Sequence, residues 1–263
     1  MVVTPPLARQ RNLLLFVLLG LATLGWAITI WRAASMRGGI DEDMGMAAAD
    51  LTMGMSAPLF LAMWVAMMVA MMFPASTPMI LAFSRSQSRR RECGSRYVPT
   101  AWFIAPYVAV WFAFGAAAYG VAVLFGAVAD DSVWVRENVP RVAGGLLIAA
   151  GIYQLTPLKR VCLGKCRTPL SFMLSYWRDG RQGAVRMGFR HGLFCLGCCW
   201  VLFLILLPLG VMNIAAMLVV TALVFAEKAM PGGERVATVA AVALITYGLL
   251  AIAVPATLPT MVV

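Results

Sequence analysis

Long uncharged apolar runs constrain the fold of this chain more than any other feature. The longest covers residues 192–226, 35 positions interrupted only by Pro208, Leu209 and Gly210 and by Asn213. A single helix of that length would exceed the thickness of a bilayer by about 20 Å. Because proline and glycine break helices and basic residues flank both ends, we expect two membrane spans joined by a tight turn.

The same pattern recurs along the whole chain and predicts an all-α fold. Of the 263 residues, 62% are hydrophobic and 12% are charged, which is outside the norm for a soluble domain. We expect one integral membrane domain, a polytopic transmembrane helix bundle of about seven spans, at residues 12–31, 57–83, 99–128, 142–156, 191–207, 211–226 and 236–254. The first run is longer than the core of a cleaved signal, so we interpret it as a retained anchor.

Charged residues between the predicted spans indicate the orientation. With the N-terminus inside, 17 of the 21 Lys and Arg fall in the cytoplasm, and seven of the 11 acidic residues fall outside. This is the distribution that the positive-inside rule describes. It accounts for the net charge of +10, so the partner that we expect is the lipid bilayer and not nucleic acid.

The segment from residue 186 to residue 200 contains the only histidine of the chain and three of its six cysteines. On a helix, His191, Cys195 and Cys198 share one face, and Cys199 lies next to them. An imidazole with two or three thiolates on one face forms a soft metal site or a reactive group of thiols. The alternative is that these cysteines are small apolar residues packed between helices.

Two further thiols, Cys162 and Cys166, lie in the basic segment that precedes this helix. The Lys and Arg residues around them favour the thiolate, which is the form that binds metal. The expected topology keeps all six cysteines in or near the cytoplasmic half, where thiols stay reduced. Ligation or thiol chemistry is therefore expected in place of structural disulfides, and the two groups of cysteines could converge.

Methionines form a stripe along the second predicted span. Met63, Met67 and Met71 recur every four residues, and Met68 and Met72 continue the stripe. Thioethers suit Cu(I), although methionine is also a flexible filler of apolar cores. An acidic, Met-bearing segment at residues 32–56 precedes the stripe on the predicted outer side. A route for a soft metal ion along the stripe is the functional interpretation.

Two polar positions near the ends of spans have simpler interpretations. We expect Asn213 to cap the helix that follows it. We interpret Glu227 and Lys228 as an interfacial pair whose lysine reaches toward the headgroups. The sequence contains no phosphate-binding loop, dinucleotide fingerprint or Ser-His-Asp constellation, which favours a function other than catalysis.

Over roughly residues 50–250 the chain resembles a bacterial family of predicted metal-binding integral membrane proteins, classed as a domain of unknown function. The resemblance rests on residues 63–74, 153–167, 186–200 and 210–213, and on Glu227 and Lys228 with Pro231. It implies a metal-binding role in a bacterial inner membrane and no settled activity.

These patterns favour an inner-membrane protein that handles copper, as a transporter or as a membrane metallochaperone. The candidate ligands are His191, Cys195, Cys198, Cys199, Cys162, Cys166, Met63, Met67, Met68, Met71 and Met72. We expect Cu(I), with zinc as the alternative metal, and a metal-donor or metal-acceptor protein as a partner. Two other functions stay open, a membrane thiol–disulfide oxidoreductase and a structural subunit of a membrane complex.

Overall fold

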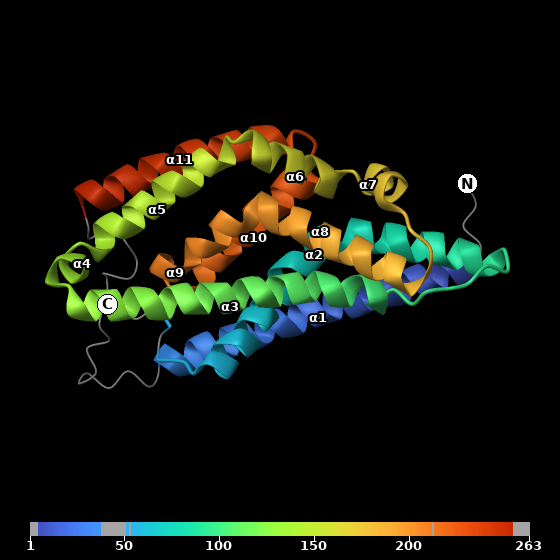
Figure 1. The fold of residues 1–263 in the computed structure, drawn as a ribbon, viewed down its shortest axis with the longest axis horizontal. Coiled ribbons are helices and arrows are strands. Elements are labelled where there is room, and N and C mark those ends of the chain that lie inside the picture. Colours follow the sequence, from blue (N-terminus) through green and yellow to red (C-terminus); the bar gives the residue numbers. More distant parts are fainter. Residues whose placement is uncertain (1–4, 38–50, 53, 212, 255–263) are drawn as a thin grey trace.

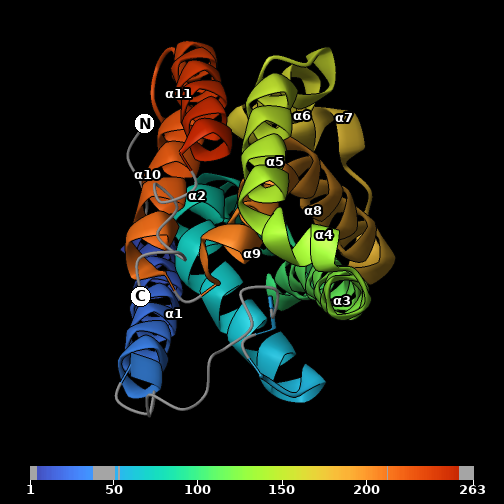
Figure 2. The same cartoon turned by 90° about the vertical axis from the view of Figure 1, so that its left-hand side faces the viewer.

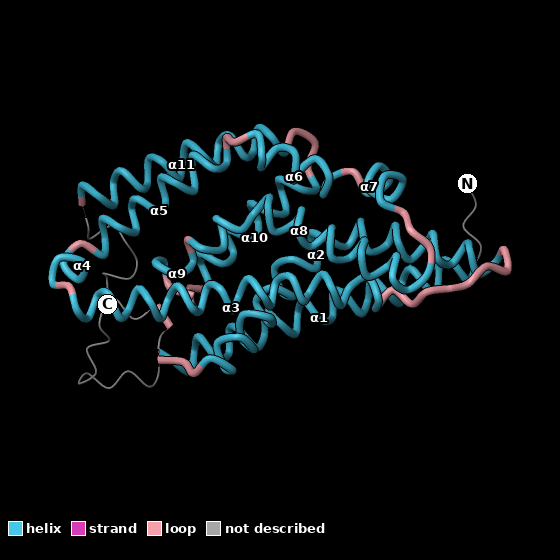
Figure 3. The backbone as a smooth tube through the Cα atoms, viewed as in Figure 1, coloured by secondary structure: helices cyan, strands magenta, loops and turns pink. Residues whose placement is uncertain are grey.

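The computed structural model describes residues 5–37, 51–52, 54–211 and 213–254 (Figure 1). Within these ranges the chain forms helices and short connections, and no strand occurs in them (Figure 3). The expected all-α fold is thereby confirmed. The helices are α1 (Pro5–Arg37), α2 (Ala57–Glu92), α3 (Ala101–Asp131), α4 (Val133–Glu137), α5 (Val139–Gln154), α6 (Pro157–Arg167), α7 (Pro169–Tyr176), α8 (Gly180–Leu204), α9 (Leu206–Leu209), α10 (Ile214–Ala229) and α11 (Gly233–Ala253).

Five of the described helical segments are long and apolar enough to cross a membrane. They are α1, α2, α3, α8 together with α9, and α11. α5 and α6 together make a further candidate, bent by 63° at the break between them. α10 has 16 residues and begins where Asn213 caps it, since Oδ1 of Asn213 accepts a hydrogen bond from the backbone N–H of Ala216 at 3.1 Å. The count of seven spans and their orientation stay predictions.

α2 and α8 are the most buried of these candidate spans. In their most apolar windows 61% and 56% of the residues are buried, compared with 22% in α1 and 28% in both α3 and α11. Figure 2 shows α2 in the middle of the bundle, with α1, α3 and α10 around it. α1 packs on α2 and exposes large apolar side chains such as Phe16 and Leu24, as a helix that faces lipid does.

α3 and α8 pack closely because a glycine lies at their contact. A Cβ atom on Gly188 would lie 2.1 Å from the carbonyl oxygen of Phe103. Any side chain at this position would push the two helices apart, and small residues are the usual means of bringing helix backbones together. The close approach places the buried face of α8 beside the aromatic side chains of α3.

α5 and α11 form an antiparallel pair, which Figure 1 shows along one side of the bundle. A Cβ atom on Gly144 would lie 2.8 Å from the carbonyl oxygen of Gly248, so the two backbones touch at this point. The span predicted at residues 142–156 therefore finds its main contact in α11. Its outer side chains, such as Ile152, are exposed.

Basic segments that lie far apart in the sequence come together at one end of the bundle. The guanidinium of Arg90 lies 2.6 Å from the carboxylate of Asp179, and the Ser88 hydroxyl donates to the Gln10 amide oxygen at 2.8 Å. The start of α1, the end of α2 and the start of α8 thus share this end (Figure 1). Most of the acidic, Met-bearing segment, residues 38–50 and Met53, lies outside the described residues.

Candidate metal centre

The buried face of α8 carries the histidine and the three cysteines that the helical spacing predicts. His191 exposes 2% of its surface, and Cys195, Cys198 and Cys199 expose 1% or less. The thiols of Cys198 and Cys199 donate to the backbone carbonyl of Cys195, at 3.1 and 2.8 Å. These bonds run back along the helix by three and four residues, so both thiols lie against the backbone next to Cys195.

Cys195 is the residue on which the contacts converge. Its Sγ atom lies 2.9 Å from Nζ of Lys228 on α10, 3.3 Å from the hydroxyl of Tyr107 on α3, and 4.0 Å from Sδ of Met72 on α2. Nζ of Lys228 also lies 3.9 Å from the Met72 sulfur. We refer to these four residues, which come from four helices, as the Cys195 site.

The Cys195 site contains a buried ammonium whose nearest partner is a sulfur atom. Lys228 is 8% exposed and Cys195 is fully buried. A buried charge is costly unless an opposite charge or hydrogen bonds compensate it. An ammonium 2.9 Å away stabilises negative charge on the sulfur, which is the form of cysteine that binds metal.

α6 brings the second pair of cysteines to α8. A Cβ atom on Gly197 would lie 2.8 Å from Sγ of Cys162, so the absence of a side chain there makes room for this thiol. Cys162 is buried and Cys166 is half-buried. The two groups of cysteines found in the sequence are therefore neighbours, whereas Cys93 is exposed just beyond the end of α2.

His191 lies one helical turn before Cys195 and is surrounded by aromatic rings. Its imidazole stacks on Tyr107 at 5.2 Å and on Phe103 at 5.8 Å, and Phe172 meets it edge-on at 5.8 Å. Neither ring nitrogen has a hydrogen-bond partner among the described residues. Buried polar atoms without partners are rare, and a neutral imidazole nitrogen is a metal ligand. His191 is thus chemically able to bind an ion beside Cys195.

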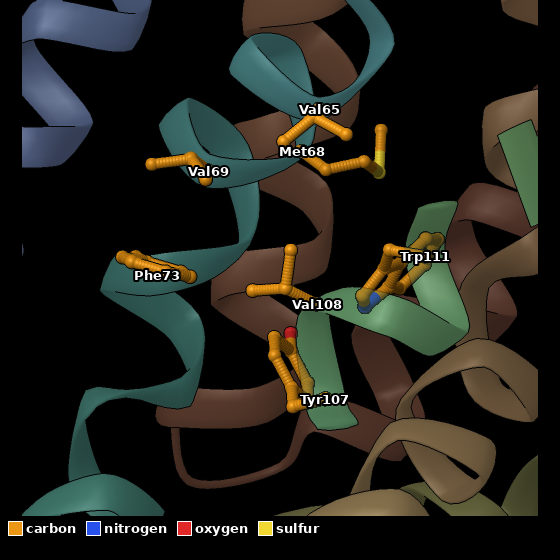
Figure 4. Close-up of a pocket in the computed structure, with 7 residues that line it drawn as sticks. All are labelled: Val65, Met68, Val69, Phe73, Tyr107, Val108 and Trp111. Carbon is orange, nitrogen blue, oxygen red and sulfur yellow. The ribbon is translucent and has the colours of Figure 1, made fainter. Parts of the chain in front are cut away.

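All five methionines of the predicted stripe are buried, and one of them reaches the Cys195 site. Met72 makes the contact with Cys195, while Met63, Met67 and Met71 follow the helix back toward its N-terminal end. Figure 4 shows Met68 lining a small apolar pocket between α2 and α3. Tyr107 lines the same pocket, so this residue connects the pocket with the Cys195 site.

No three His, Cys, Asp or Glu side chains in the described ranges already have the geometry of a metal site. The Cys198 and Cys199 thiols point to a backbone carbonyl, which explains why they do not face a common centre with Cys195. Turning them toward such a centre requires new χ1 rotamers, the kind of side-chain change that commonly accompanies binding.

A family model described as a copper chaperone, PpoB2, matches residues 61–251. This range covers most of the chain and contains every residue of the Cys195 site, His191 and the cysteines of α6. The chain belongs to the PpoB2 family. Membership supports copper as the metal of the predicted metal-binding role. No curated protein and no solved structure matches this PpoB2 chain.

The roles of Glu227 and of two lysines in this PpoB2 protein were missed in the sequence. Glu227 is 1% exposed and accepts hydrogen bonds from Nζ of Lys159 at 2.7 and 2.9 Å and from the Gln154 amide at 3.2 Å. The interpretation of Glu227 and Lys228 as an interfacial pair is wrong. Successive residues on a helix point about 100° apart, so Glu227 enters this ion pair while Lys228 enters the Cys195 site. The sequence did contain a signal for these roles, since Glu227 and Lys228 directly follow the apolar run 192–226. Ionisable groups at such positions are usually functional or paired.

Proposed function

We propose that this PpoB2 protein is a membrane-embedded chaperone that binds Cu(I) at the Cys195 site and passes it to an acceptor protein. One observation carries the proposal, the convergence of sulfur atoms from three helices: Cys195 of α8 lies beside Met72 of α2, and Cys162 of α6 lies against α8 at Gly197. Thiolates and thioethers are soft donors, the class that Cu(I) prefers over oxygen ligands. His191, Cys198, Cys199 and Cys162 are the further ligand candidates within the same packed region.

The proposed location is a bacterial inner membrane, with seven spans and the N-terminus inside. Five described helical segments long enough to span, and the exposed apolar side chains of α1, support this location. The gathering of basic residues at one end of the bundle supports the orientation.

The methionine stripe is proposed as the entry path and Cys166 as the exit. Met63, Met67 and Met71 are spaced one helical turn apart, so an ion bound to one sulfur can form a bond to the next before the first bond breaks. Met72 would deliver the ion to Cys195. Cys166 is half-buried on α6, which packs against α8, and this position suits transfer to an acceptor outside the bundle.

The burial of the α8 thiols favours metal binding over thiol–disulfide exchange. Exchange requires the sulfur of one protein to attack the sulfur of the other directly. Cys195, Cys198 and Cys199 are each exposed by 1% or less, so a partner's sulfur has no access to them in this conformation. A single metal ion needs far less space than a partner protein.

Metal analysis of the purified full-length protein, loaded with Cu(I) under reducing conditions, tests the proposal. Cys195→Ser and Cys198→Ser should each lose most of the bound copper. Cys93→Ser is the matched control and should bind as much copper as the unmodified protein. Equal copper content in all three variants would rule out the proposed site. A lack of bound copper in the unmodified protein would rule out the proposed function.

A further inference from the structure

Lys228 occupies an unusual position for a lysine, because its ammonium contacts the atoms that we propose as copper ligands. Nζ lies 2.9 Å from Sγ of Cys195 and 3.9 Å from Sδ of Met72. Within the described ranges no carboxylate lies at ion-pair distance from Lys228. Its positive charge is therefore balanced only by sulfur.

Binding of Cu(I) can leave this buried site without a net charge. Because a net charge is costly in a buried site, the Lys228–Cys195 pair carries none before binding, whichever of the two atoms holds the shared proton. When Cu(I) enters, it forms one bond to the Cys195 thiolate and one to a second cysteine sulfur, whose S–H bond breaks and whose proton leaves to water. One positive charge has entered and one has left. The two-thiolate Cu(I) complex carries −1, Lys228 carries +1, and the buried site is again neutral.

A divalent ion changes this balance. Zn(II) or Cd(II) on the same two thiolates forms a neutral complex, so the nearby ammonium is left as an uncompensated charge. Uncompensated charge in an apolar interior is strongly unfavourable. Met72 and His191 bind as neutral ligands and do not alter the sum. A divalent ion reaches neutrality beside Lys228 only with a third thiolate, and the thiols of Cys198 and Cys199 are held at the Cys195 carbonyl. The geometry therefore favours monovalent ions.

We propose that Lys228 makes the Cys195 site selective for monovalent over divalent metal ions, by supplying the positive charge that neutralises a two-thiolate complex of Cu(I). This inference rests on the proposed copper function and specifies which ions the site accepts. Lys228 is not a ligand here, and it acts through its charge on the ions that Cys195 binds.

Binding measurements on the full-length protein in detergent, under reducing conditions, test the inference. Lys228→Leu removes the charge without adding a donor atom, and Lys228→Arg is the matched control that keeps the charge. Each protein is titrated with Cu(I), Ag(I), Zn(II) and Cd(II) in competition with a chelator of known affinity. Removing a neighbouring positive charge should weaken Cu(I) and Ag(I) binding about 10-fold or more and strengthen Zn(II) and Cd(II) binding by a similar factor. Lys228→Arg should retain the selectivity of the unmodified protein.

Ag(I) and Cd(II) provide a test that needs no variant, because both ions are soft and they differ in charge. The unmodified protein should bind Ag(I) at least about 100-fold more tightly than Cd(II) once the affinities of both ions for a simple dithiol are taken into account. Equal preference would overturn the inference. A Lys228→Leu protein that weakens all four ions by one common factor would also overturn it, because the lysine would then be structural.

If Lys228→Leu does not fold, Lys228→Gln carries the same comparison, since its amide is neutral and can still hydrogen-bond to Cys195. Failure of the unmodified protein to bind Cu(I) is a separate result, and it counts against the proposed function itself.

Discussion

Two lysines are buried in the described part of this protein, and they differ in what balances their charge. Lys159 on α6 is 1% exposed and holds the Glu227 carboxylate at 2.7 and 2.9 Å. Lys228 on α10 is 8% exposed and lies 2.9 Å from the Cys195 sulfur. Glu227 and Lys228 are adjacent residues, so one turn of α10 contributes to both pairs.

The difference separates a structural pair from a site that can do chemistry. A carboxylate held by lysine and by Gln154 already has its partners, and the pair ties α5 and α6 to α10. That connection also holds Cys162 and Cys166, both on α6, against α8. A thiol held by lysine keeps an electron pair that a soft metal can use. The Lys159–Glu227 pair holds the proposed ligands in place, and the Lys228–Cys195 pair is the one that we propose balances the charge of a bound ion.

Breaking the buried Lys159–Glu227 ion pair should produce the largest loss of stability. Lys159→Leu leaves Glu227 buried without its counter-charge, and removing one partner of a buried pair typically costs about 3–5 kcal/mol. Adding Glu227→Gln removes the remaining charge and should recover most of the loss. Unfolding curves in detergent measure the free energy of unfolding for each variant. A double variant as unstable as Lys159→Leu would show that the charge is not the cause.

Removing Lys228 should cost less stability than removing Lys159, although both side chains are buried. The partner left behind by Lys228→Leu is a thiol, which is ordinarily neutral at pH 7, whereas an ordinary carboxyl group is ionised at that pH. We expect Lys228→Leu to be more stable than Lys159→Leu by about 1–3 kcal/mol, since only one of them leaves a buried charge. The same unfolding curves decide the order. A reversed order would mean that Cys195 stays charged when the lysine is gone.

The helices and the buried face of α8 could be predicted from the sequence, because both depend on local spacing. Apolar runs of sufficient length give the helices, and the four-residue spacing puts His191 and Cys195 on one face. The cap at Asn213 is likewise local. The burial of the methionines follows from the same periodicity. In each case the information lies within a few turns of one helix.

The partners of the charged residues could not be predicted, because they depend on how the helices pack. Lys159 lies in a segment with eight Lys and Arg between residues 157 and 190, and it resembles its solvent-exposed neighbours in sequence. Its partner Glu227 is 68 residues away. Lys228 meets Cys195 across 33 residues and a break in the helix. Only the packing of α6 and α10 against α8 distinguishes these lysines from the exposed ones.

His191→Phe separates binding from packing at the edge of the Cys195 site. Phenylalanine can keep the contacts with Tyr107, Phe103 and Phe172 and removes two buried nitrogens that lack partners. Since an unsatisfied buried polar group costs about 1–3 kcal/mol, stability should stay the same or rise. If His191 is a ligand, the affinity for Cu(I) should fall about 10-fold, a change of about 1.4 kcal/mol. Unchanged affinity would assign the histidine to packing alone.

The smallest effect on stability is expected on α2, where the methionines are buried whether or not they carry copper. Leucine has nearly the volume of methionine and lacks the sulfur, and swaps of this kind usually cost less than about 1.5 kcal/mol. Replacing Met63, Met67 and Met71 together by leucine should therefore leave folding nearly intact, while copper loading falls if their sulfurs form the entry path. Met72→Leu is the matched comparison, because it alone removes the sulfur that lies 4.0 Å from Cys195. Copper loading and thermal stability measured on both proteins decide the matter. Normal loading in the triple variant, with reduced loading in Met72→Leu, would keep the Cys195 site and withdraw the path along α2.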